Sequence, residues 1–171
     1  MPVRLSIERG LGEARLRAAI QRRADAMLAL LQLEKAELSL VLSGDEQIRE
    51  LNKIYRGKDK PTDVLAFPMR EGDFGRLHAA LPTGLLGDVI VSIPTAKRQA
   101  RAAKRELLGE VTMLVAHGLL HLLGWDHETA AKDRKMRAET ERLVAAAESR
   151  DPGGRSRASG ITKQKPHKRT T

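Results

Sequence analysis

The order of hydrophobic and polar residues predicts strands and helices that do not alternate regularly. Short runs that alternate apolar and polar residues, or are apolar throughout, are typical of strands; they cover residues 3–8, 36–42, 62–68 and 87–93. Longer stretches with apolar residues every three or four positions predict helices; they cover residues 13–33, 44–56, 94–105, 106–123 and 130–148. The predicted fold class is therefore α+β, with a small mixed sheet packed against helices.

Several of these elements carry more specific expectations. Ser43 is expected to cap the second helix, whose apolar face is formed by Ile48, Leu51 and Ile54. Residues 70–86 contain three glycines and one proline and are expected to form a loop. Four arginines of the first helix are expected largely on its solvent side; they are Arg15, Arg17, Arg22 and Arg23.

The helix over residues 106–123 is apolar nearly all round, which indicates a central, buried, zincin-like helix. The last part of this helix contains the start of the motif HGLLHLLGWDH, residues 117–127. This motif holds three of the five histidines of the chain. His117 and His121 are four positions apart and so lie on one helix face. Gly124 can adopt the left-handed conformation that ends a helix, so His127 can turn back towards them.

Three imidazoles in this pattern predict a metal site. Burying imidazoles among leucines costs free energy unless the ring nitrogens have partners. Three neutral imidazoles with a fourth position left for water are typical of catalytic zinc. We therefore expect His117, His121 and His127 to bind one zinc ion per chain, although nickel or cobalt would suit the same ligands.

The histidine spacing equals that of the metzincin proteases, which have a glutamate directly after the first histidine. That glutamate is the general base, and its loss typically costs about 10²–10⁴-fold in rate. The corresponding residue here is Gly118, so a metallopeptidase is disfavoured.

Charge and composition favour a polyanionic partner. The net charge is +9, and residues 151–171 contain six Lys or Arg against one Asp. Only 2% of the residues are aromatic, which favours phosphate contacts by Lys and Arg over base stacking. The chain has no cysteine, which excludes disulfides and thiolate metal sites.

The domain organisation follows from the same patterns. Residues 1–148 are expected to form one domain, and residues 149–171 a basic, disordered tail that either aids solubility or contacts nucleic acid. Neither a signal peptide nor a membrane span is predicted, so we expect a cytoplasmic protein with no membrane partner.

The motif HGLLHLLGWDH resembles the signature of the YbeY endoribonuclease family, zinc-binding bacterial rRNA maturation factors, and the resemblance extends well beyond this motif. The resemblance covers roughly residues 1–148, and Trp125 and Ala66 depart from the usual Tyr and Ser. The resembling positions are Asn52, Arg56, the run DKPTDVLAFP (residues 59–68), the run GDVIVS (residues 87–92) and the run TAKRQA (residues 95–100).

The resemblance implies a zinc-dependent endoribonuclease specific for single strands, acting at the small-subunit rRNA 3′ end and in ribosome quality control. It implies single-stranded RNA, rRNA and the small ribosomal subunit as partners, with no nucleotide cofactor. It identifies His117, His121 and His127 as metal ligands, and Arg56 together with His117 as candidate catalytic residues. An arginine fork can hold a phosphate at two points and stabilise developing charge.

Several alternatives stay open at this stage. The nucleophile can be metal-bound water, whose pKa a divalent metal lowers towards about 7, or the 2′-hydroxyl of the RNA. A non-catalytic ribosome-associated factor with a structural zinc is the alternative from another functional class. Four carboxylates are weaker candidates for the site, and none is identified as the general base; they are Asp63, Asp88, Glu110 and Asp126.

Overall fold

The fold is built on one mixed four-stranded sheet. The computed structural model describes residues 3–11, 14–69 and 84–151, and the sheet lies within them. The strands are β1 (Val3–Ile7), β2 (Ala36–Ser43), β3 (Val64–Pro68) and β4 (Gly84–Ser92). Their order is β1-β2-β4-β3; the first three are parallel, and β3 is antiparallel to β4 at one edge.

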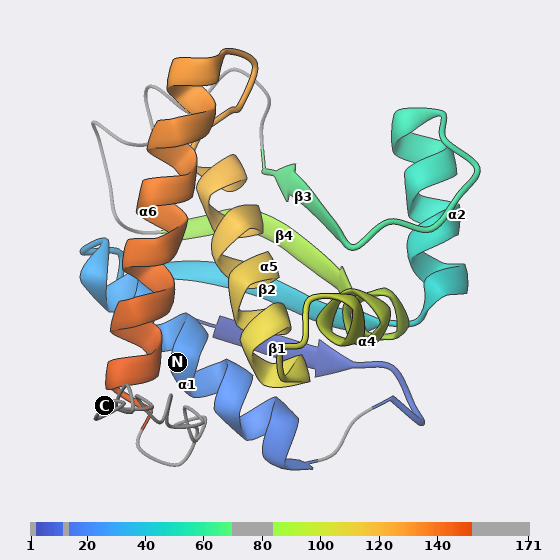
Figure 1. Ribbon diagram of the computed structural model, residues 1–171, viewed down its shortest axis with the longest axis horizontal. Coiled ribbons are helices and arrows are strands. Elements are labelled where there is room, and N and C mark those ends of the chain that lie inside the picture. Colours follow the sequence, from blue (N-terminus) through green and yellow to red (C-terminus); the bar gives the residue numbers. More distant parts are fainter. Residues whose placement is uncertain (1–2, 12–13, 70–83, 152–171) are drawn as a thin grey trace, which may run out of the picture.

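Five helices pack around this sheet in the described part of the chain (Figure 1). They are α1 (Ala14–Leu30), α2 (Asp45–Arg56), α4 (Ile93–Ala102), α5 (Leu107–Leu122) and α6 (Ala130–Ser149). The predicted α+β class and the mixed sheet are confirmed. None of these helices is long and apolar enough to cross a membrane.

The sheet separates two apolar clusters because side chains alternate between its faces. Val89 and Val91 of β4 belong to the main core, which α5 shares with α1 and α6. Ile90 belongs to a smaller cluster on the other face, with Ile48 of α2 and Leu65 of β3. Helices α2 and α5 therefore lie on opposite faces of the β3–β4 edge.

Helix α5 is the central, buried helix that the sequence predicts. Ten of its residues are buried, and it packs against β3, β4, α1, α4 and α6. Gly118 allows a close approach of α5 to the sheet: a Cβ atom on it would lie 2.7 Å from Cγ1 of Val89. The two helical histidines are thereby held next to β3.

Three expectations about single residues are wrong. Ser43 is the last residue of β2, fully buried, and Gly44 is the N-cap of α2 without a side-chain hydrogen bond. Ile54 is 71% exposed instead of lying on the apolar face of α2. Arg23 is buried, and its Nε donates to Oδ2 of Asp151 at 3.0 Å.

The loop expected over residues 70–86 is shortened at its end, because β4 begins at Gly84. Residues 70–83 and residues 152–171 lie outside the described part of the chain, so the loop and the basic tail stay predictions there. The predicted extent of the domain, residues 1–148, also stays a prediction. Just beyond it, α6 ends at Ser149 and Asp151 is buried.

Candidate metal centre

The turn after α5 brings the third histidine back to the other two. Gly124 has φ +86°, the left-handed conformation predicted for it, and the backbone N–H of Trp125 donates to the carbonyl of Leu120 at 3.0 Å. Oδ1 of Asp126 then accepts a hydrogen bond from the backbone N–H of Glu128 at 3.1 Å. These local hydrogen bonds fix the path of the chain on both sides of His127.

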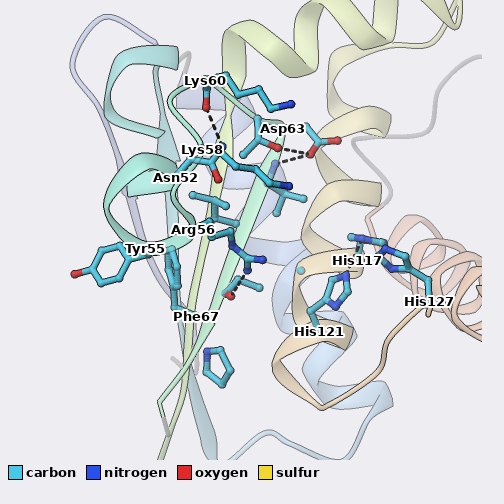
Figure 2. A pocket seen from close by; sticks show the side chains of 16 residues that line it. Asn52, Tyr55, Arg56, Lys58, Lys60, Asp63, Phe67, His117, His121 and His127 are labelled. Atoms are coloured by element: carbon cyan, nitrogen blue, oxygen red, sulfur yellow. Dashed lines mark hydrogen bonds between the residues drawn. The ribbon is translucent and has the colours of Figure 1, made fainter. Parts of the chain in front are cut away.

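The three imidazoles meet at one point, as predicted (Figure 2). One ring nitrogen from each of His117, His121 and His127 lies within 4.8 Å of the others. The Nε2 atoms of His117 and His121 are 3.0 Å apart. Two nitrogens bound to a tetrahedral zinc ion at about 2.0–2.1 Å lie about 3.3 Å apart, so the observed separation fits such an ion closely.

The electrostatics of two of these ligands, His117 and His121, favour the neutral form that binds a metal. Burial, together with the charges that His117 and His127 would carry when protonated, lowers the pKa of His121 to about 4. Burial also lowers the pKa of His117, although Asp63 and Asp133 act in the opposite direction. His121 is therefore neutral at pH 7 with its lone pair available, and a cation bound by imidazoles alone would keep its full charge.

A groove of about 690 Å³ leads from the histidines towards α2 and β3. Its lining includes Arg56, Lys58 and Lys60, so three cationic side chains line the groove that the imidazoles reach. Figure 2 shows the histidines on one side of this groove and Arg56 on the other. The sequence-predicted metal ligands and the sequence-predicted catalytic arginine thus share one groove.

Arg56 is held at the end of α2 by a specific turn. Gly57 has φ +68° and caps the helix, its backbone N–H donating to the carbonyl of Lys53 at 3.1 Å. The buried side chain of Asn52 donates to the carbonyl of Lys60 at 2.9 Å and so holds the loop after α2, which contains Lys58 and Lys60, against this helix. Nη2 of Arg56 donates to the carbonyl of Ala66 on β3 at 3.4 Å, so this arginine does not cap its own helix.

The four candidate carboxylates have different surroundings. Asp63 lines the groove, with Oδ1 accepting from the backbone N–H of Val64 at 2.8 Å and Oδ2 from Gln99 at 3.2 Å. Asp126 is part of the turn and also pairs with Lys132 at 3.2 Å. These contacts give both carboxylates a structural role beside the histidines.

The other two carboxylates lie away from the groove. Glu110 is 1% exposed and pairs with Arg105 at 3.0 Å, so it is neither a surface charge nor part of the groove lining. Asp88 lies on β4 opposite Phe67 and is not among the residues that line the groove.

Sequence reasoning assigned no site role to four charged or aromatic residues of the groove. Lys58 and Lys60 belong to a charged loop that is typical of any solvated turn, and Tyr55 and Phe67 carry no motif of their own. The only available signal is their position directly beside Arg56 and within the run 59–68.

Comparison with known proteins gives a uniform result. Residues 6–148 match the family described as Endoribonuclease YbeY. The Endoribonuclease YbeY of Aquifex aeolicus is 47% identical over 125 residues, which is 73% of this chain and 79% of that protein. That of Geobacter sulfurreducens is 40% identical over 141 residues, or 81% and 89% of the two chains.

A solved structure has the same fold. The solution structure of TM1509 from Thermotoga maritima superposes with a TM-score of 0.61 and 25% sequence identity. The match covers 92% of this chain and 99% of that one.

Proposed function

This chain belongs to the Endoribonuclease YbeY family, hydrolases that act on RNA, and on that basis we propose that it is a zinc-dependent endoribonuclease specific for single-stranded RNA. We propose rRNA as its substrate, at the 3′ end of the small-subunit RNA, with roles in maturation and ribosome quality control. Its partner would be the small ribosomal subunit, and its location the cytoplasm, where ribosomes are assembled.

One observation carries the chemical part of this proposal: three converging imidazoles line the same groove as three cationic side chains. His117, His121 and His127 would hold the zinc ion. When bound, the ion would supply Lewis-acid stabilisation of the phosphate that is cleaved. The groove would place RNA phosphates beside it through Arg56, Lys58 and Lys60.

Arg56 has the position of a transition-state stabiliser in this scheme. Arg56 is an exposed residue, and its guanidinium lies across the groove from the histidines, where its fork can hold a phosphate (Figure 2). Phosphodiester cleavage builds negative charge on the non-bridging oxygens, and a preoriented cation stabilises that charge without reorganisation.

A structural zinc in a non-catalytic factor fits the residues less well. Structural zinc sites are closed by four protein ligands. In the described residues the group contains three histidines, one of them exposed. A peptidase is disfavoured because Gly118 is buried against Val89 and Val64, which leaves no room there for the glutamate of a metzincin.

The test is zinc-dependent cleavage of single-stranded RNA by wild type, Arg56→Ala and Arg56→Lys. Removing one preoriented donor of transition-state charge should lower kcat about 10²–10³-fold. Lysine keeps the charge but not the fork, so Arg56→Lys should lie between alanine and wild type. Arg4→Ala is the matched control, because Arg4 is an exposed arginine on β1, at the opposite edge of the sheet from β3.

Zinc content is measured on every variant, so that a lost metal is not mistaken for a lost arginine. If Arg56→Ala folds, keeps its zinc and cuts as fast as Arg4→Ala, Arg56 has no catalytic role. If the wild type binds small subunits and cuts no RNA, the non-catalytic alternative replaces the proposal. RNA with a single 2′-deoxy nucleotide at the cleaved position identifies the nucleophile: cleavage persists with water and stops with the 2′-hydroxyl.

A further inference from the structure

The groove contains an aromatic pair that phosphate binding does not require. The chain has one tyrosine, two phenylalanines and one tryptophan, and two of these four, Tyr55 and Phe67, line the groove beside Arg56. Their ring centroids are 5.1 Å apart with an interplanar angle of 54°. Tyr55 is nevertheless 66% exposed.

Phe67 gives this pair a rigid base. It lies on β3, opposite Asp88 of β4, and packs against the apolar cluster of Ile48, Leu65 and Ile90. Tyr55 rests on one side of it, and Cζ of Arg56 lies 6.0 Å from its ring centroid. The position of the tyrosine ring is thus set by the sheet before any ligand binds.

A role in the apolar core does not explain the aromatic ring of Tyr55, because the residue is mostly exposed. Most of its ring is in water, and among the described residues its hydroxyl has no hydrogen-bond partner. An exposed, preoriented aromatic ring next to a line of cations is the combination that binds single-stranded nucleic acid. The cations follow the phosphates, and the ring stacks on a base.

We propose that Tyr55, supported by Phe67, stacks on one unpaired base of the RNA, next to the phosphate that Arg56 holds. This inference rests on the proposed function and adds the source of its strand specificity. In Figure 2 Arg56 lies between the histidines and the aromatic pair, so a strand with its cleaved phosphate at Arg56 extends a neighbouring nucleotide to Tyr55. A base in a duplex is already stacked and paired and cannot reach this ring.

The experiment combines Tyr55 variants with RNA that lacks one base. Short single-stranded RNAs, each with one abasic nucleotide near the cleaved bond, are cut by the zinc-loaded protein. In the wild type, one abasic position should raise KM about five- to tenfold, the low end of the contribution of one base–aromatic stack. Tyr55→Ala should raise KM for intact RNA by a similar factor with kcat nearly unchanged, because a contact equal in ground and transition states is lost.

The diagnostic result is that the two changes are not additive. In the Tyr55→Ala variant, which lacks the ring, the same abasic position should cause no further increase in KM. Tyr55→Phe should behave as wild type, because the ring is kept. Ile54→Ala is the matched control, since Ile54 is 71% exposed on the same helix and does not line the groove.

The outcomes separate this inference from the proposed function. Wild-type protein that cuts no RNA overturns both. Wild-type protein that cuts RNA while Tyr55→Ala keeps its KM, or while the abasic and Tyr55→Ala effects add in full, overturns only the stacking site. Equal effects of Tyr55→Ala and Ile54→Ala would show that KM responds to any truncation on this helix surface, and would also refute the inference.

Discussion

Replacing Gly118 with alanine tests how the sheet positions the histidines. The added Cβ would lie 2.7 Å from Cγ1 of Val89 and 3.2 Å from Cγ2 of Val64. Ordinary carbon–carbon contacts are about 3.5–4.0 Å, so the closest pair falls short by about 1 Å. Val89 is fully buried and its β-branched side chain is stiff at χ1, so the strain has to be relieved by moving α5 away from the sheet.

The free energy follows from two opposing effects. Overpacking a well-packed core costs about 1–3 kcal/mol, whereas alanine is favoured over glycine within a helix by about 1 kcal/mol. Gly109 lies on the same helix and its Cβ would meet nothing within 4 Å, so Gly109→Ala keeps only the favourable effect. Gly118→Ala should therefore be less stable than Gly109→Ala by about 1–3 kcal/mol, the overpacking cost alone.

The measurement is urea unfolding of both variants without metal, followed by far-UV circular dichroism. The free energies of unfolding in water are compared between the variants. Cleavage of single-stranded RNA is a second readout, because a shift of α5 by about 1 Å would displace two ligands relative to Arg56 and can cost about 100-fold in rate. If Gly118→Ala is as stable and as active as Gly109→Ala, the contact with Val89 does not set the helix position.

Three further predictions concern stability and metal binding. Asp151→Ala should lower the free energy of unfolding by about 3 kcal/mol in the same urea assay, because the buried Arg23 loses a buried carboxylate partner. Arg4→Ala, which breaks an exposed pair, should cost less than about 1 kcal/mol, and equal effects would refute the reasoning. Burial acts to raise the pKa of Asp45, but hydrogen bonds from Ser92, Thr95 and Arg98 outweigh it and lower the pKa below its ordinary value. This carboxylate therefore stabilises the fold fully above its unfolded pKa of about 3.9, and the stabilisation is lost as the pH falls through its lower folded pKa. In urea unfolding at a series of pH values, the free energy of unfolding of an Asp45→Asn variant should decrease less steeply with falling pH than that of the wild type. Removing metal with a chelator should lower the Tm and abolish cleavage, and added zinc should restore both; a His121→Ala variant should show no such response.

Local residue patterns are enough to predict most of the helices and strands. Residues alternate between apolar and polar in β1 and β2 because one side of each strand is more buried than the other, and α5 is apolar nearly all round because most of its surface is buried. Both patterns are visible within a short stretch of sequence. The errors arise where a distant partner decides. Ser43 extends β2 instead of capping α2 because it pairs in register with Ser92 of β4. Arg23 is buried because it pairs with Asp151, which lies 128 positions later in the chain.

The sequence by itself determined the histidine cluster, because its three members lie within eleven residues on one helix and the turn that follows. Helix periodicity and a left-handed glycine are local properties, so their geometry is present in the spacing. Only the tertiary structure decided what faces that cluster. Arg56, Lys58 and Tyr55 reach the groove because β3 adds antiparallel to β4 at the sheet edge and α5 approaches that edge at Gly118. Such contacts join residues about sixty positions apart, and no spacing along the chain encodes them.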